Sequence, residues 1–264
     1  MRLLKLNTQI FFYLLSFILC LNINAQDKTI SGTDKNVKEI PFAKNKIMLI
    51  PFENRMYMSE IDMAINKETK LNAKQIKATM RDGMNEQLYK KLKAKMQVVD
   101  LLEDTVKTKK DLAGIYKHLS YEFVKVPSQE NYVAPKKEKE EKKIQKGQLA
   151  IETNSDERFM NAKVKDASLV PYLYGKYNTN LFLFINELDI KLMPATPGDF
   201  SNVSNRKISV HYTIYTYNAK EINSGLAEVI LPTNVNTPSK ISNTYFSQIA
   251  DLLVARIQKA LIVK

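Results

Sequence analysis

Apolar residues along the chain follow the periodicities of strands and helices, most clearly between residues 46 and 102. A short apolar run at residues 47–50 precedes a helical pattern over residues 73–95 and a second short run at residues 98–99. Runs that are apolar at every position are typical of strands covered on both faces, and Pro51 ends the first of them. This stretch therefore predicts a strand–helix–strand unit.

The expected helix has an apolar residue at every fourth position: Ile76, Met80, Met84, Leu88, Leu92 and Met96. At about 100° per residue such a stripe drifts by about 40° at each step, so its two ends face different neighbours. Gly83 interrupts the helix and costs about 1 kcal/mol relative to alanine. Either it marks a close approach of another segment or it is simply tolerated.

The second half of the chain predicts strands over residues 181–192, 206–217 and 226–231 and a helix over residues 241–262. In the first of these strands the alternation predicts that Leu188, Ile190 and Leu192 face inward and that Glu187, Asp189 and Lys191 face outward. The far end of this strand is therefore expected to leave the helical cover. In the next strand, His211 lies on the face opposite to Val210. Helices are also expected over residues 111–123 and 168–177, and a short helix is expected to begin with Ser59 as its cap.

These elements predict an α/β (α+β) fold, with a single mixed sheet of about five strands covered by helices. The expected order is β-α-β-α-α-β-β-β-α. Residues 136–143 form a run of mixed charge with almost nothing to bury, so residues 127–165 are expected to be a flexible insertion. Residues 26–44 are expected to be a flexible leader, and residues 45–264 a single domain.

The N-terminus has the pattern of a secretory signal peptide over residues 1–25. Arg2 and Lys5 precede an apolar core, and Ala25 provides the small residue before the cut. The alternative, a membrane anchor, needs about 20 apolar residues, and this run is shorter. Leu19 disfavours a lipoprotein signal at Cys20, because such signals place a small residue there. We therefore expect cleavage near Ala25, a periplasmic or secreted protein, and no membrane span in the mature chain.

Loss of the signal peptide would lower the net charge from +12 to +10. The lysines are spread along the chain and interleaved with glutamates, which favours a solvated surface over a polyanion site, and export disfavours nucleic acid as a partner. Cys20 is the only cysteine, so its removal with the signal would leave no thiol for catalysis or for metal binding.

The sequence lacks the common catalytic signatures: the nucleophile elbow, the glycine-rich phosphate loop and the paired histidines of zinc proteases. Its two histidines, His118 and His211, are far apart in the sequence. Glu53, Glu60 and Asp62 follow the first strand and offer paired carboxylates for acid–base work on a glycan, although a hydrated acidic loop is the simpler interpretation. We expect a protein that is not an enzyme and uses no cofactor.

The loop after the first strand is unusually apolar, which indicates a partner surface. Its candidate contact residues are Phe52, Met56, Tyr57, Met58, Ile61 and Met63. We expect some of them to remain exposed, because exposed apolar area usually marks a contact site and methionine adapts to its partner. Replacement of Met56, Tyr57 and Met58 with serine is then expected to leave the fold nearly intact. A copper site at Met56 and Met58 is disfavoured, because no histidine or cysteine is nearby.

Three segments resemble those of periplasmic α/β domains in the group of CsgG, LpoB and the N-terminal domain of TolB. They are residues 46–52, residues 96–100 after a long helix, and residues 177–184 before a long hairpin. Where such domains often carry Gly-Ala-Asp, this chain has residues 178–180. Asp104-Thr105-Val106 resembles the acceptor for O-glycosylation in Bacteroidetes secreted proteins, with Thr105 as the acceptor.

The resemblance implies a non-catalytic module that binds other envelope proteins, or further copies of itself, in the periplasm. The alternative is an envelope protein that binds or hydrolyses glycans through the acidic residues after the first strand.

Overall fold

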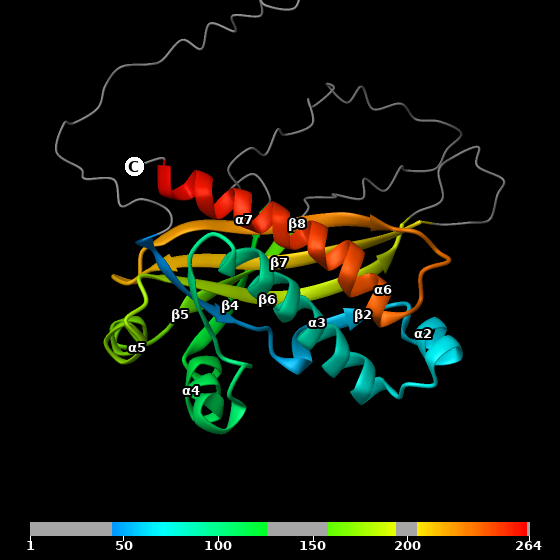
Figure 1. Ribbon diagram of the computed structural model, residues 1–264, viewed down its shortest axis with the longest axis horizontal. Helices are drawn as coiled ribbons and strands as arrows, with labels where there is room; N and C mark the ends of the chain where they lie inside the picture. Colours follow the sequence, from blue (N-terminus) through cyan, green and yellow to red (C-terminus); the bar gives the residue numbers. More distant parts are fainter. Residues whose placement is uncertain (1–43, 126–157, 194–204, 263–264) are drawn as a thin grey trace, which may run out of the picture. The chain divides into compact units, whose positions relative to one another are not determined.

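The computed structural model describes residues 44–125, 158–193 and 205–262. All of them belong to one compact unit, residues 39–264. A mixed sheet is its centre, with the strand order β3-β1-β6-β7-β8 and β2 also paired with β6 (Figure 1). A second sheet contains two strands, β4 and β5. The strands are β1 (Lys46–Ile50), β2 (Tyr57–Ser59), β3 (Gln97–Asp100), β4 (Leu119–Lys125), β5 (Arg158–Val164), β6 (Leu181–Leu192), β7 (Arg206–Thr216) and β8 (Glu221–Leu231).

The helices connect and cover these strands. They are α2 (Asp62–Thr69), α3 (Ala73–Lys93), α4 (Thr105–Lys117), α5 (Leu169–Tyr177), α6 (Pro238–Lys240) and α7 (Ser247–Ile262). A 3-10 turn covers Asn54–Met56, and a π-helical turn, Ile241–Phe246, leads into α7. The predicted mixed α/β fold is confirmed, and the five predicted strands are present. The predicted order and the single sheet are incomplete, because β2 and α2 precede α3, and β4 and β5 form a second sheet between α4 and α5.

Strand β6 is the middle strand of the main sheet and has strand partners along both edges. On one edge it pairs antiparallel with β7, which pairs antiparallel with β8. On the other edge β1 runs parallel to its first half, with Ile47 opposite Leu181, and β2 runs parallel to its second half, with Tyr57 opposite Leu188. The successive strands β1 and β2 therefore share a single edge of β6.

Helices α3 and α7 cover one face of the main sheet (Figure 1). Helix α3 begins with a capping box, in which Asn72 accepts a hydrogen bond from the Gln75 N–H and the Gln75 side chain accepts one from Asn72. Its stripe Ile76, Met80, Met84, Leu88 and Leu92 is buried in the core beneath α7. Gly83 lies against Ser242 of the π-helical turn, which confirms the close approach of another segment as the reason for a glycine.

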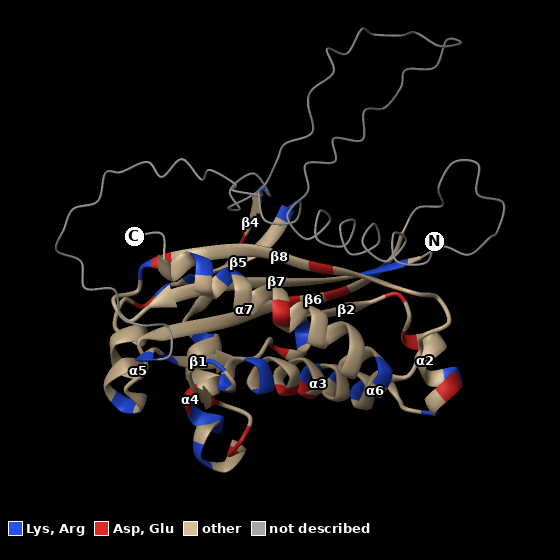
Figure 2. Cartoon of the chain, turned by 45° about the horizontal axis from the view of Figure 1, so that its top comes forward, with Lys and Arg blue, Asp and Glu red and all other residues tan. Residues whose placement is uncertain are grey.

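The opposite face of the main sheet is divided between helices and the β4–β5 hairpin. A second apolar cluster joins β1 and β6 to α4 and α5, through residues that include Met48, Phe184, Ile115 and Leu173. Helix α5 contains Pro171 in its first turn, where no intrahelical N–H bond is lost. Basic and acidic residues are interspersed along α3, as expected of a solvated surface (Figure 2).

Strand β5 contacts the main sheet with one edge of its backbone. The Met160 N–H donates to Nδ1 of His211 at 2.7 Å, and Asn186 Nδ2 donates to the Met160 carbonyl oxygen at 2.8 Å. The Ala162 N–H donates to Oγ1 of Thr213 at 3.1 Å. Because an unpaired strand edge must find other partners when buried, these side chains replace the missing neighbouring strand.

Three expectations from the sequence are corrected by these elements. Residues 111–123 do not form one helix, since α4 ends at Lys117 and the chain continues as β4. The expected insertion over residues 127–165 extends too far, because residues 158–164 form β5. The end of β6 differs in that Leu192, expected inside, is about half exposed.

The expected signal peptide over residues 1–25, with Cys20, residues 26–43 of the expected leader over 26–44, and the charged run at 136–143 lie outside the described residues. Among helices in the described parts of the chain, none is long and apolar enough to cross a membrane.

Candidate functional site

The loop between β1 and α2 is held in the core by three of the six residues expected at a partner surface. Phe52, Tyr57 and Ile61 are at most 3% exposed and pack in the cluster beneath α3. The pairing of β2 with β6 is the reason, since it returns the loop to the sheet and turns these side chains inward. These three candidates are therefore not part of an exposed surface, and the exposed ones are to be found among the methionines.

The methionines of this loop have different surroundings. Met56 is partly buried against the core, whereas the side chains of Met58 and Met63 are 53% and 87% exposed. Met58 lies on β2 and Met63 in the first turn of α2, with Asp62 between them in the sequence. Since Met56 packs on the core and Met58 faces solvent, the two thioethers lie in different environments.

Two open hollows adjoin Met58 and Met63, and Asp62 lines both. The first, of about 670 Å³, lies between α2 and the start of α3 and is lined by Asp62, Met63, Ala64, Asn66, Lys67, Lys70, Ala73 and Ile76. The second, of about 420 Å³, lies beside β2 and is lined by Tyr57, Met58, Ser59, Glu60, Asp62, Lys77, Ile190 and Lys191. We call Met58, Met63 and the linings of these hollows the Met58–Met63 surface.

The acidic residues after the first strand are each engaged by a different neighbour. Glu53 forms an ion pair with Arg55 at 2.7 Å. A carboxylate oxygen of Glu60 accepts a hydrogen bond from the Leu192 N–H, and Asp62 accepts one from the Tyr57 hydroxyl at 2.7 Å. These contacts stabilise the loop locally and do not direct the three carboxylates towards a shared substrate position.

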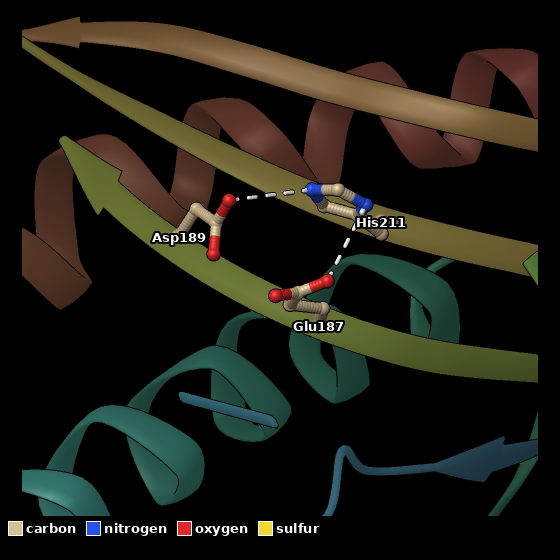
Figure 3. A group of neighbouring side chains, drawn as sticks. All are labelled: Glu187, Asp189 and His211. Atoms are coloured by element: carbon tan, nitrogen blue, oxygen red, sulfur yellow. Dashed lines mark ion pairs between the residues drawn. The ribbon is translucent and has the colours of Figure 1, made fainter. Parts of the chain in front are cut away.

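A second polar group consists of Glu187 and Asp189 of β6 and His211 of β7 (Figure 3). It lies on the side of the main sheet that β5 contacts, because His211 accepts the Met160 N–H. All three residues are less than a tenth exposed, so the expectation that Glu187 and Asp189 point to solvent is wrong. Oε2 of Glu187 lies 3.8 Å from Nδ1 of His211, and Oδ2 of Asp189 lies 3.7 Å from Nε2. The imidazole therefore faces one carboxylate with each of its nitrogens.

The pKa values of the two carboxyl groups are shifted in opposite directions. Burial raises the pKa of Glu187, and the neighbouring charge of Asp189 raises it further. Burial also acts to raise the pKa of Asp189, but the facing His211 and the ammonium of Lys191 outweigh it, so the net pKa is lowered. A proton held by the pair is therefore favoured on Glu187, while Asp189 remains the anion.

Two carboxylates and an imidazole are ligand types that divalent cations accept, and their ligand atoms lie within 4.8 Å of one another. A histidine that binds metal with one nitrogen normally donates a proton from the other. Here the Met160 N–H already occupies the lone pair of Nδ1, so Nε2 must keep its proton. Lys191 also engages Oδ2 of Asp189 at 2.5 Å. This arrangement does not suit a metal ion.

The remaining sequence candidates lie at the ends of α4. Thr105 is the first residue of the helix and is exposed, after Asp104, whose side chain caps it. His118 is the last residue before β4, where its Nδ1 lies 2.8 Å from the Gly114 carbonyl oxygen. His118 therefore lies at a helix end, and O-glycosylation of Thr105 stays a prediction.

Similarity to known proteins is limited to solved structures. No family model matches the chain, and no curated protein sequence matches it. Among solved structures, the chain is similar to the hypothetical protein CT253 from Chlamydia trachomatis, with 10% sequence identity and a TM-score of 0.39. That similarity covers 84% of this chain and 100% of the other, and a score of this size supports no functional conclusion.

Proposed function

We propose that the chain is a non-catalytic interaction module of the cell envelope that contacts a partner protein through the Met58–Met63 surface. The observation that carries the proposal is the exposure of Met58 and Met63 beside two open hollows. The loop that presents them is held rigidly, because Phe52, Tyr57 and Ile61 pack in the core. Rigid presentation of adaptable side chains reduces the entropy lost on binding.

The chemistry of the first hollow suits a protein segment. Met63, Ala64, Ala73 and Ile76 form its apolar part, while Lys67 and other polar side chains contribute to its lining. An apolar surface with polar groups around it is the usual composition of a contact region between proteins. Placement in the envelope rests on the signal-peptide pattern of residues 1–25 and on the resemblance to periplasmic α/β domains.

The test is site-specific photo-crosslinking of the full chain in the cells that naturally produce it. A photoreactive residue at position 58 or 63 is expected to yield the same discrete protein adduct. Position 106 is the matched control, since Val106 is also an exposed apolar residue, on α4. Adducts that are equal at all three positions, or none at positions 58 and 63, would contradict the proposed surface.

The compartment is tested separately. Amino-terminal sequencing of the protein from the periplasmic fraction is expected to begin close to Gln26. A protein that begins at Met1 and remains in the cytoplasm would contradict the envelope assignment. The crosslinking experiment would still test the Met58–Met63 surface.

A further inference from the structure

Helix α4 presents a basic side to solvent. Lys110 and Lys117 lie seven residues apart, which is close to two turns and places them on the same side of the helix, with Lys109 next to them. All three lysines are exposed. The opposite side of the helix packs on the main sheet through Leu112 and Ile115, which are buried.

The acidic side chains near this basic side have other partners. Asp104, the cap of α4, pairs with Lys107 at 2.9 Å, and Asp111 pairs with Lys176 of α5 at 2.7 Å. Together, α4 and α5 contain five lysines and a single acidic residue. In the described parts of the chain, no carboxylate therefore neutralises the three exposed lysines of the basic side.

Helix α5 lies beside α4 and adds aromatic side chains to this region (Figure 1). Tyr172 and Tyr174 of α5 and Tyr217, which follows β7, are between 41% and 55% exposed. The Tyr172 hydroxyl donates to Oδ1 of Asp111 on α4 at 3.4 Å. The ring centroids of Tyr174 and Tyr217 lie 5.2 Å apart. The two helices therefore present lysines and tyrosines to solvent side by side.

The outer ridge of α5 is made of small residues. Pro171 and Gly175 are exposed and lie one helical turn apart, between Tyr172 and Tyr174 around the helix. A Cβ atom added at Gly175 would meet no other atom within 4 Å. Because the ridge is low, the tyrosine rings on either side of it can reach a flat partner that rests on the helix.

We propose that α4 and α5 form a lipid-binding surface, through which the protein rests on a membrane rich in anionic phospholipid. Lysine ammonium groups are attracted to the phosphates of such a membrane. Tyrosine favours the boundary between membrane and water, because its ring is apolar and its hydroxyl is polar. This inference is independent of the Met58–Met63 surface. We call the residues that carry it the lysine–tyrosine surface: Lys109, Lys110, Lys117, Tyr172, Tyr174 and Tyr217.

A bilayer fits this surface better than a single-stranded nucleic acid does. Such strands are bound in a basic groove, where the bases stack on open aromatic ring faces. Here the lysines lie on the outer side of a helix, and the rings of Tyr174 and Tyr217 lie against each other at an interplanar angle of 36°. A soluble polyanion of any kind would use the lysines and leave the tyrosine rings without a role.

The first test is co-sedimentation of the protein, purified as the cell produces it, with lipid vesicles at low ionic strength. Wild-type protein is expected to bind vesicles of equal parts phosphatidylglycerol and phosphatidylcholine, and to bind pure phosphatidylcholine much more weakly. Replacement of Lys109, Lys110 and Lys117 with glutamine is expected to weaken binding to the anionic vesicles by about a hundredfold. Undiminished binding by this variant would overturn the proposal, and so would equal binding of the wild type to both kinds of vesicle.

The matched control removes the same charge from another helix. Lys90, Lys93 and Lys95, at or just after the end of α3, are also exposed. Their replacement with glutamine is expected to change vesicle binding by less than about threefold, because these lysines act only at long range. An equal loss of binding in both triple variants would show that net charge alone attracts the protein, and would overturn the assignment to α4 and α5.

The second test separates a lipid surface from a polyanion site. Combined Tyr174→Ser and Tyr217→Ser is expected to weaken binding to the anionic vesicles by about tenfold, because the rings no longer enter the interface. Both positions are exposed, so the fold should be retained. Wild-type binding by this double variant would overturn the lipid assignment. Complete displacement of wild-type protein from the vesicles by single-stranded DNA, at an equal concentration of phosphate, would do the same.

Discussion

Gly83 of α3 lies so close to the π-helical turn before α7 that a Cβ atom at position 83 would stand 2.9 Å from Oγ of Ser242. The Ser242 hydroxyl also donates to the Gly83 carbonyl oxygen at 3.2 Å. The two elements therefore approach at a point where neither can gain an atom without displacement.

Gly83→Ala is expected to lower the free energy of unfolding by up to about 2 kcal/mol. Overpacking costs about 1–3 kcal/mol and outweighs the gain in helix propensity of about 1 kcal/mol. Urea denaturation measures the change. Gly114→Ala is the matched control, since no atom lies within 4 Å of the added Cβ in α4, and it is expected to stabilise the protein. Stabilisation by both substitutions would show that the approach at Ser242 is looser than described.

Asp111→Asn is expected to destabilise the packing of α4 against α5 by about 1–3 kcal/mol at neutral pH. The buried Asp111 carboxylate accepts hydrogen bonds from Lys176 at 2.7 Å and from the Tyr177 hydroxyl. Burial acts to raise the Asp111 pKa, but Lys176 and Tyr177 outweigh it and the net pKa is lowered. A lowered pKa contributes stability above the unfolded value of about 3.9, and this contribution is lost as pH falls through the folded value.

The difference between the Asp111 variant and the wild type should therefore shrink in urea titrations below about pH 4. Glu86→Gln is the control, because its ion pair with Lys90 is exposed on both sides and contributes little. A cost at position 111 that does not change with pH would contradict the role of the charge.

Glu187→Gln is expected to gain stability relative to the wild type as pH rises. The raised pKa of Glu187 means that the folded protein binds this proton more tightly than the unfolded chain does. The wild type therefore loses stability as pH increases from the unfolded value of about 4.3 through the raised value, whereas glutamine has no proton to lose. Urea denaturation at about pH 5 and about pH 8 measures the trend. A variant whose stability relative to the wild type falls at the higher pH would show that ionised Glu187 stabilises the fold.

Tyr57→Ala is expected to lower the free energy of unfolding by about 3–5 kcal/mol, since the ring is buried. Tyr57→Phe should cost about 1 kcal/mol for the lost bond to Asp62. Met63→Ser, at an exposed position, should change stability by no more than about 0.5 kcal/mol. Thermal unfolding of the three variants measures these differences. A melting temperature of Tyr57→Ala equal to that of the wild type would contradict the prediction. The expectation that serine at positions 56, 57 and 58 leaves the fold intact is thus not retained for Tyr57.

The elements that were predictable from the sequence are those whose periodicity persists over several residues. β6 is one, because its apolar run and later alternation both require a strand, and α3 is another, because its stripe and Asn72 cap agree. β4 was missed for a local reason. Leu119 continues the helical spacing of Leu112 and Ile115, so nothing in the pattern marks the end of α4 at Lys117.

The candidate sites depended on contacts between distant segments, which periodicity does not record. Alternation correctly placed Glu187 and Asp189 on one face of β6, but the approach of β5, through Met160 and His211, was not visible in it. In the same way, the apolar character of the loop after β1 was evident, while the inward direction of Tyr57 followed from the pairing of β2 with β6.

The sharing of one edge of β6 by β1 and β2 has a consequence for the newly made chain. The Lys46 N–H donates to Oδ1 of Asn180, a contact that spans 134 residues. During translation, β1 and β2 therefore remain without β6, the strand with which both pair, until more than 130 further residues have been synthesised. Closing so long a loop slows folding, and a chaperone that shields apolar strands would have most to protect during that interval.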